Sequence, residues 1–358
     1  MLKILVLTLG LVAQFSYAKE PIPSAWINAY HKTLTINGEY SYPLVRLQRK
    51  RARPVVLLHG LGGNPHHFID LGTNLYKRGY DVWAFRWTSV NRSLDESGAQ
   101  TVEELIDIVN RVTKKKVILV GHSLGGMVSK ISLYGARKLP SGKWGIDHKS
   151  KERMAKRVLG FISIASPNGL GLSASDPIIK FLNFVPDYEI PLIRNLSHII
   201  NEGDVEKEML SLEMMRFFRL TFGNLATNFF TKGLINLRNY ERDSYSLSRI
   251  MKYGFSPLSK KAKAQFEHWI NIEQITSIDE ELDYTRIFFQ EKNPVPFAYV
   301  AAGDDNIAFG EYVIDEAMKH NSPFLFLPRS GHLDTIIGKK VSKVGNFIDK
   351  FIKKISRK

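Results

Sequence analysis

Six short apolar runs of five to seven residues alternate along this chain with stretches whose apolar residues recur at helical spacing. Runs of this length, rich in β-branched and aromatic residues, are typical of buried strands. Their alternation with amphipathic helices is typical of a parallel sheet covered by helices on both faces. The sequence therefore predicts an α/β fold with a mostly parallel sheet. The predicted strands are 54–58, 80–85, 116–120, 158–164, 297–301 and 323–327, and the predicted helices are 65–77, 102–112, 124–136, 310–319 and 341–355.

The alternation is interrupted between Pro167 and Pro294, where no run of this type occurs. This interval is far longer than the roughly 30 residues of one strand–helix–strand unit. We predict an inserted helical cap or lid at 170–293, with the core formed by 19–169 and 294–358. Aromatic and methionine side chains in the insertion suit an acyl pocket, but they are equally expected if the cap simply packs on the core. Which of them contact a substrate is left open.

The first 18 residues have the pattern of a cleavable signal peptide. Lys3 precedes an apolar stretch, and the small residues Ser16 and Ala18 stand at the −3 and −1 positions of a cleavage site. An N-terminal membrane anchor is the alternative, but the apolar stretch is well short of the roughly 20 residues that cross a bilayer. We expect an exported protein that is periplasmic or secreted and that can associate with a membrane surface.

The charge and the missing cysteines limit the function classes. The chain has no cysteine, which excludes disulfides, thiolate metal sites and a thiol nucleophile. Its 50 Lys and Arg against 35 Asp and Glu give a net charge of +15. An exported basic protein is expected to meet an anionic membrane surface or envelope polysaccharide rather than nucleic acid, although a solvated helix face accounts equally for such basic runs. The basic runs are 46–53, 114–116 and 353–358.

The motif most specific for chemistry is Gly121-His122-Ser123-Leu124-Gly125-Gly126, which lies between a predicted strand and a predicted helix. A Gly-x-Ser-x-Gly sequence in this context predicts a nucleophile elbow, because only glycine fits beside such a sharp turn. The turn presents the Ser123 hydroxyl, and the Leu124 amide at the helix start can stabilise an oxyanion.

A second glycine-rich segment, 59–63 (His-Gly-Leu-Gly-Gly), follows the first predicted strand. It could begin a dinucleotide-binding fingerprint, but Pro65 stands where the third glycine is required. We therefore predict that the Leu61 amide joins the Leu124 amide in an oxyanion hole.

A serine nucleophile needs a base, and ten histidines are candidates. His332 follows the last predicted strand, and loops at the carboxyl ends of parallel strands are where such sites assemble. We predict His332 as the general base. His59 and His122 adjoin the two glycine motifs and are predicted to be structural.

The acid that orients the histidine is predicted to follow strand 297–301, where Asp304 and Asp305 are adjacent. Only one of them can face the histidine. We favour Asp305 because an apolar run follows it, and we keep Asp304 as the alternative acid. Asp334 is expected to hold the His332 loop or to cap a helix.

These motifs, in the order Ser123, Asp305, His332, resemble the α/β-hydrolases, and among them bacterial lipases and carboxylesterases. The resemblance rests on 59–63, 121–126, Ile164-Ala-Ser-Pro167 and Gly331-His332, and it covers roughly 54–168 and 295–356. It implies an α/β-hydrolase fold and the lipase or esterase type of activity.

We therefore predict a serine hydrolase that cleaves carboxylic esters, acting on an ester or lipid through an acyl-enzyme. An acyltransferase, a thioesterase or an amidase with the same triad is the first alternative. A non-catalytic envelope-binding protein on a hydrolase scaffold is the second. No cofactor and no metal is predicted.

Overall fold

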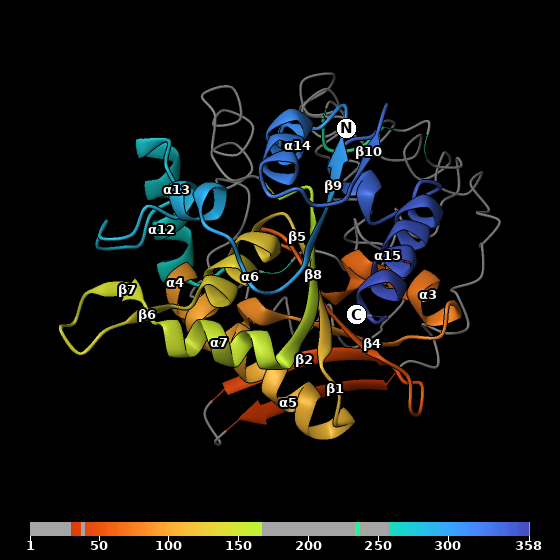
Figure 1. The fold of residues 1–358 in the computed structure, drawn as a ribbon, viewed down its shortest axis with the longest axis horizontal. Helices are drawn as coiled ribbons and strands as arrows, with labels where there is room; N and C mark the ends of the chain where they lie inside the picture. The colour runs from red at the N-terminus through yellow and green to blue at the C-terminus, as the bar shows by residue number, and fades with distance from the viewer. Residues whose placement is uncertain are drawn as a thin grey trace, which may run out of the picture.

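A computed structural model describes residues 30–36, 40–166, 233–236, 239, 256 and 258–357. Its centre is an eight-stranded sheet with the order β1-β2-β4-β3-β5-β8-β9-β10 (Figure 1). The six strands from β4 to β10 pair in parallel, which confirms the predicted α/β class. Their bounds are β3 Pro54–Leu58, β4 Asp81–Phe85, β5 Val117–His122, β8 Val158–Ile164, β9 Phe297–Ala302 and β10 Phe324–Leu327.

Two strands at one edge are absent from the sequence-based prediction. β1 (Tyr30–Ile36) and β2 (Tyr40–Leu47) pair with each other in antiparallel fashion, and β2 pairs in the same way with β4. Arg46 lies at the join, where its guanidinium donates to both carboxylate oxygens of Asp81 and lies over the Trp83 ring. A second small sheet, also unpredicted, consists of β6 (Ala136–Lys138) and β7 (Trp144–Ile146).

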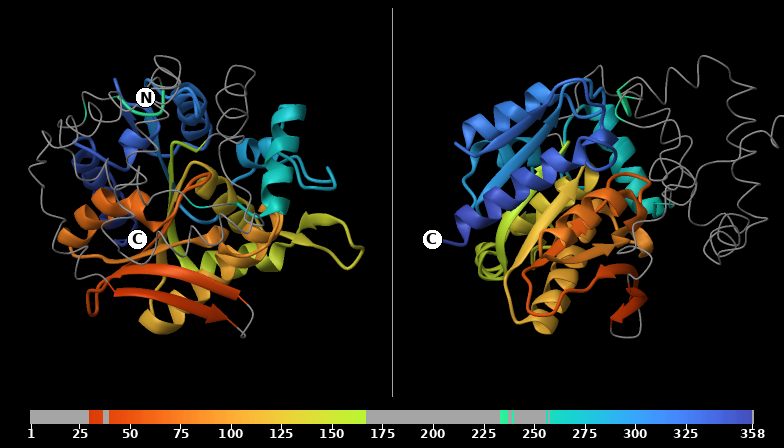
Figure 2. Two further views of the ribbon diagram at one scale, coloured as in Figure 1. Left: turned by 180° about the vertical axis from the view of Figure 1, so that it is seen from behind. Right: turned by 90° about the vertical axis from the view of Figure 1, so that its right-hand side faces the viewer.

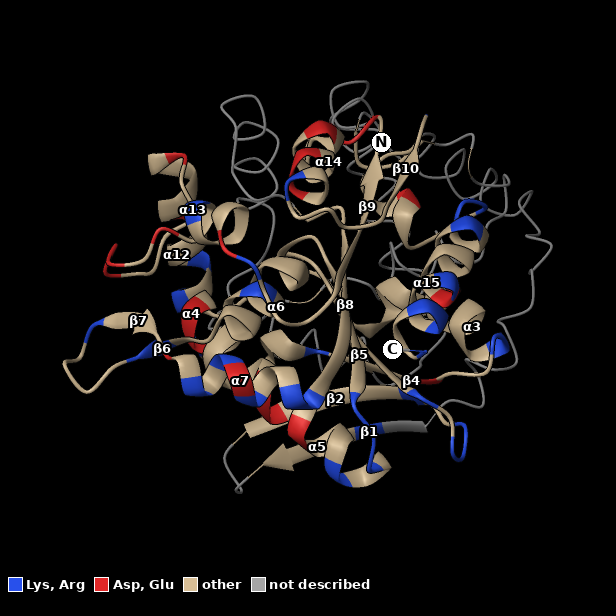
Figure 3. Ribbon diagram, in the orientation of Figure 1, with Lys and Arg blue, Asp and Glu red and all other residues tan. Residues whose placement is uncertain are grey.

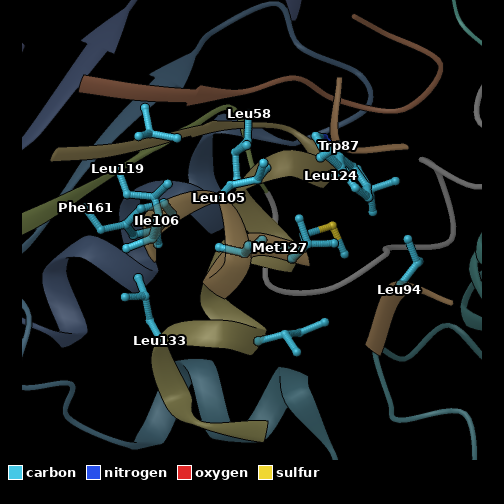
Figure 4. Packing of buried hydrophobic residues seen from close by; sticks show 14 of the residues in the cluster. Leu58, Trp87, Leu94, Leu105, Ile106, Leu119, Leu124, Met127, Leu133 and Phe161 are labelled. Atoms are coloured by element: carbon cyan, nitrogen blue, oxygen red, sulfur yellow. The ribbon is translucent and has the colours of Figure 1, made fainter. Parts of the chain in front are cut away.

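Helices cover both faces of the main sheet (Figure 2). The side chains of each strand alternate between two separate apolar clusters, as the twofold period of a strand requires. In β3, for example, Val56 and Leu58 join one cluster while Val55 and Leu57 join the other. The first cluster includes α5 (Glu103–Thr113) and α6 (Leu124–Tyr134), whose Leu105, Ile106 and Met127 pack on Leu119 and Phe161 (Figure 4). The second cluster includes α3 (Ile69–Lys77) and α15 (Val341–Ile355).

The predicted helices are present with small shifts at their ends. The segment predicted at 65–77 is a 3-10 turn, η1 (Pro65–Phe68), followed by α3 (Ile69–Lys77). The helix predicted at 124–136 ends two residues early, because Gly135 adopts a left-handed backbone with φ 80°. That helix is α6 (Leu124–Tyr134), and the remaining predicted helices correspond to α5 (Glu103–Thr113), α14 (Gly310–Lys319) and α15 (Val341–Ile355). Helices that the sequence did not predict include α4 (Leu94–Glu96), the π-helical η3 (Ser97–Val102) and α7 (His148–Arg157).

The later part of the predicted insertion contains α12 (Lys260–Ile272) and α13 (Tyr284–Gln290). Their Trp269 and Phe288 are fully buried and belong to the same apolar cluster as α5 and α6. The aromatic and methionine clusters at 181–185, 214–218 and 229–230 lie outside the described residues, as does the predicted leader 1–18. The bounds of the cap therefore stay a prediction. Among the described helices, none is long and apolar enough to cross a membrane.

Candidate active site

Ser123 lies in the turn between β5 and α6, with φ 53° and ψ −126°. A positive φ is strained for a residue with a Cβ atom, and such strain is typical of functional turns. The flanking glycines allow the turn, since a Cβ on Gly121 would lie 2.5 Å from Gly126 Cα. A Cβ on Gly125 would lie 2.2 Å from the Leu58 carbonyl oxygen. The sharp elbow that the Gly-x-Ser-x-Gly spacing predicts is therefore present.

The loop 59–63 lies directly against this turn. A Cβ on Gly60 would come within 2.8 Å of Ser123 Cβ, so that only glycine fits there. Within the described part of the chain, neither the Leu61 amide nor the Leu124 amide has a hydrogen-bond partner. Leu124 is also the first residue of α6, where the helix dipole favours negative charge. Both amides are therefore free to donate to an oxyanion beside Ser123.

His332 and Asp305 are in direct contact at the carboxyl ends of β10 and β9. His332 Nδ1 lies 2.7 Å from Asp305 Oδ2, and both side chains are almost fully buried. A carboxylate can only accept, so Nδ1 donates and Nε2 of the neutral ring is left as the basic atom. This is the tautomer that a general base for a serine hydroxyl requires.

The two adjacent aspartates face in different directions. The second carboxylate oxygen of Asp305 accepts hydrogen bonds from the amides of Ile307 (2.8 Å) and Ala308 (2.9 Å), which fixes its orientation. Asp304 is exposed, and its carboxylate accepts from the Asn236 side chain at 3.2 Å. The structure therefore places Asp305, the favoured residue, beside His332 and places Asp304 away from it.

The segments that carry Ser123 and His332 are in contact through His122. No hydrogen bond joins Ser123 Oγ to His332 among the described residues, although His122, the neighbour of Ser123, packs on the His332 ring with centroids 4.7 Å apart. Hydrogen bonds of catalytic groups are often long in ligand-free sites and shorten when substrate binds. Ser123 as a residue is 7% exposed.

Burial keeps the two other histidines of the motifs neutral. The pKa of His59 is lowered to about 3 by burial, and its ring stacks on Trp87. Burial, with a further contribution from nearby His332, lowers the pKa of His122 well below its ordinary range. Neither ring is expected to carry a proton charge near neutral pH, which fits the structural role predicted for both.

A model of the alpha/beta hydrolase family matches residues 55–336 of this sequence. The chain belongs to the alpha/beta hydrolase family. Family membership agrees with the strand order, the elbow and the Ser…Asp…His order found above, and it supports a hydrolase function. Among curated proteins, no sequence matches this chain.

Solved structures with similar folds include several hydrolases, all of low sequence identity. A thermophilic esterase from Thermogutta terrifontis has a TM-score of 0.54 at 14% identity, covering 92% of this chain and 99% of its own. A bacterial membrane phospholipase A, described as a virulence factor, has 0.54 at 11%, covering 100% and 99%. The thioesterase domain of the curacin biosynthetic pathway has 0.51 at 13%, covering 90% and 99%. These likenesses show the alpha/beta hydrolase fold.

The His332 loop is held by Asp334 together with two asparagines, of which the sequence predicted only Asp334. Asp334 Oδ2 accepts from the Gly331 amide (2.8 Å), the Asn236 amide (2.9 Å) and the Asn239 side chain (2.5 Å). Asp334 was expected to hold this loop, but the two asparagines come from the insertion and carry no motif.

No group of three or more side chains that could hold a metal ion occurs among the described residues.

Proposed function

We propose that this alpha/beta hydrolase is a serine hydrolase that cleaves carboxylic esters. The observation that carries the proposal is the buried His332–Asp305 pair at the same edge of the sheet as the strained Ser123 turn. A histidine held in one tautomer by a carboxylate activates a serine hydroxyl, which is otherwise a weak nucleophile.

The mechanism follows from these positions. His332 Nε2 removes the Ser123 proton, and the serine oxygen attacks the ester carbonyl carbon. The Leu61 and Leu124 amides donate to the oxyanion of the tetrahedral intermediate, where one such donor typically contributes about 2.7–4 kcal/mol. The imidazolium, stabilised by Asp305, then protonates the departing alcohol, and the acyl group remains on Ser123. In the second half, His332 activates water, which releases the carboxylate and regenerates the serine.

A panel of p-nitrophenyl esters of increasing acyl length tests this function. The wild-type protein should hydrolyse at least one member, and Ser123→Ala should lose that activity by a factor of about 10³ or more. Ser166→Ala is the matched control, because Ser166 is a buried serine whose Oγ has no hydrogen-bond partner in the described chain and lies against Gly126. Equal rates for wild type and Ser123→Ala would contradict the proposal.

Product analysis with added alcohols separates hydrolysis from acyl transfer. Ester hydrolysis predicts the free carboxylic acid as the main product at all alcohol concentrations. An acyltransferase with the same triad would give mainly the new ester, and a thioesterase or amidase would prefer the corresponding thioester or amide. The acyl length that is cleaved fastest identifies the substrate class.

We also propose export through the leader at 1–18, with the mature protein in the periplasm or the medium. The leader pattern supports this, and the net charge of +15 supports an anionic membrane surface as a partner. Mass spectrometry of the mature N-terminus tests cleavage after Ala18; an intact N-terminus in the exported fraction would contradict it.

If an anionic membrane surface is a partner, binding of the protein to anionic vesicles should weaken as the salt concentration is raised.

A further inference from the structure

A groove lies at the amino ends of β9 and β10, at the opposite edge of the sheet from the candidate active site. Its volume is about 390 Å³, within the roughly 300–1,000 Å³ of small-molecule sites. Phe297, the first residue of β9, contributes to its wall, whereas Asp305 lies three residues beyond Ala302, the last residue of that strand. Six residues of strand span about 16 Å, so the groove is distinct from the site at the carboxyl edge.

The floor of the groove is apolar and closely packed. Val295, Phe297 and Phe351 are each more than nine-tenths buried, yet they line the groove. Ile355 completes the floor, and packing beneath it is tight, since a Cβ on Gly160 would lie 2.5 Å from Ile355 Cδ1 and 3.1 Å from Phe351 Cε1. Such a floor offers preformed apolar surface to a hydrocarbon chain.

The rim of the groove is positively charged. Lys292 and Lys354 line it, and no Asp or Glu does. Neither lysine forms an ion pair with a described residue, although the residues beside them do: Glu291 pairs with Lys151, and Lys353 pairs with Asp349. The last turn of α15, which carries Lys353 and Lys354, is marked blue near the C-terminus in Figure 3. The groove thus combines two unpaired cations with an apolar floor.

We propose that this groove binds an anion that carries an alkyl chain. The carboxylate or phosphate head group pairs with Lys292 and Lys354, and the chain lies on Phe297 and Phe351. An uncharged chain would leave the two cations unpaired, and a small inorganic anion would leave the apolar floor exposed to water. The two sources of this chemistry are a free long-chain carboxylate and an anionic lipid of a bilayer. The proposal goes beyond the ester hydrolase function and does not depend on it.

Octanoate, 1-octanol and acetate are suitable probes, with calorimetry on the full Ser123→Ala protein so that no turnover interferes. Octanoate should bind at least about fivefold more tightly than either 1-octanol or acetate. The double variant Lys292→Gln/Lys354→Gln should weaken octanoate binding by about five- to tenfold, which corresponds to about 1.0–1.4 kcal/mol for the two exposed ion pairs together. Ser322→Trp, which fills the groove without changing its charge, should abolish binding.

The matched control is Lys343→Gln/Lys350→Gln, which removes two exposed lysines of the same helix that do not line the groove. It should leave octanoate binding unchanged within a factor of two. Octanoate bound elsewhere on the protein would not respond to the groove variants. Equal octanoate affinity of the Ser123→Ala protein with and without Lys292→Gln/Lys354→Gln or Ser322→Trp would overturn the proposal. Equal affinity for 1-octanol, or no binding of octanoate, would also overturn it.

Vesicles of phosphatidylglycerol and of phosphatidylcholine distinguish the two sources. Binding to phosphatidylglycerol vesicles that octanoate displaces and that Lys292→Gln/Lys354→Gln weakens would assign the groove to a bilayer lipid. Octanoate binding that responds to the groove variants, without vesicle binding, would assign it to a free carboxylate. Either result supports an anionic amphiphile as the ligand. Because the Ser123→Ala protein is used throughout, neither outcome bears on ester hydrolysis.

Discussion

His122 Nε2 donates a hydrogen bond of 3.2 Å to the backbone carbonyl of His332, and the two imidazole centroids are 4.7 Å apart. A carbonyl oxygen can only accept, so the His122 Nε2 atom carries the proton. His122 is the last residue of β5 and directly precedes Ser123, whereas His332 is 210 residues further along the chain. The contact therefore ties the loop that carries the proposed base to the turn that carries the proposed nucleophile.

His122 is expected to act as a positioning residue for His332. His122→Ala removes one of two donors to the buried His332 carbonyl, since Thr335 Oγ1 also donates to it at 2.7 Å. Loss of one such hydrogen bond costs about 0.5–1.5 kcal/mol and should lower kcat/KM by about three- to tenfold. His122→Gln can still donate from its amide at a similar reach and should recover most of the loss. The pH profile of kcat/KM should keep its shape in His122→Gln. A loss of thermal stability in His122→Ala without any change in kcat/KM would show that the contact is only structural.

Asp305 and Asp304 provide a matched pair of substitutions. Asp305→Asn keeps an acceptor for the Ile307 and Ala308 amides but presents a group that favours the wrong tautomer of His332, so kcat should fall by about 10⁴. Asp304→Asn changes an exposed side chain and should alter kcat by less than about threefold. Steady-state rates with the fastest ester measure both. A large loss in Asp304→Asn with a small one in Asp305→Asn would reverse the assignment.

Asp95 is expected to make stability depend on pH. Its buried carboxylate accepts from Tyr284 Oη (2.8 Å) and from the Ile278 amide (2.7 Å), and burial raises its pKa from 3.8 to about 6. The folded state therefore binds the proton more tightly than the unfolded state. The free energy of unfolding should fall as pH rises from about 4 to about 6, by about 3 kcal/mol for this group.

Urea unfolding of wild type and Asp95→Asn across this pH range measures the effect. The wild type should lose about 3 kcal/mol relative to Asp95→Asn between pH 4 and pH 7, because asparagine does not titrate. Asp315→Asn, at an exposed position on α14, is the control and should follow the wild-type curve. Parallel curves for wild type and Asp95→Asn would mean that Asp95 is not titrating in this range.

The parallel part of the sheet could be predicted from the sequence because both of its faces are buried. Val55, Val56, Leu57 and Leu58 are all fully buried, so a continuous apolar run reports the strand. The edge strands could not be recognised in this way. β2 alternates buried and partly exposed residues and contains Pro43, and β1 mixes Lys32 and Thr33 with apolar residues. Helix α7 was missed because it is very polar and buries only Ser150 and Met154.

The candidate site was predictable where a motif fixes the local backbone. The elbow at Ser123 and the loop at Gly60 follow from glycine positions that admit no Cβ. The choice between Asp304 and Asp305 needed the structure, because the path of a loop decides which neighbour turns inward. The contacts from Asn236 and Asn239 to Asp334 join segments about 95 residues apart, and no local pattern indicates them.

Labelling with a fluorophosphonate probe tests whether Ser123 is an activated nucleophile. The probe reacts with serines that a neighbouring base deprotonates, and mass spectrometry locates the adduct. The wild-type protein should carry one adduct on the peptide that contains Ser123, and His332→Ala should label far more slowly. An unlabelled wild-type protein, or an adduct on another residue that persists in Ser123→Ala, would contradict the account.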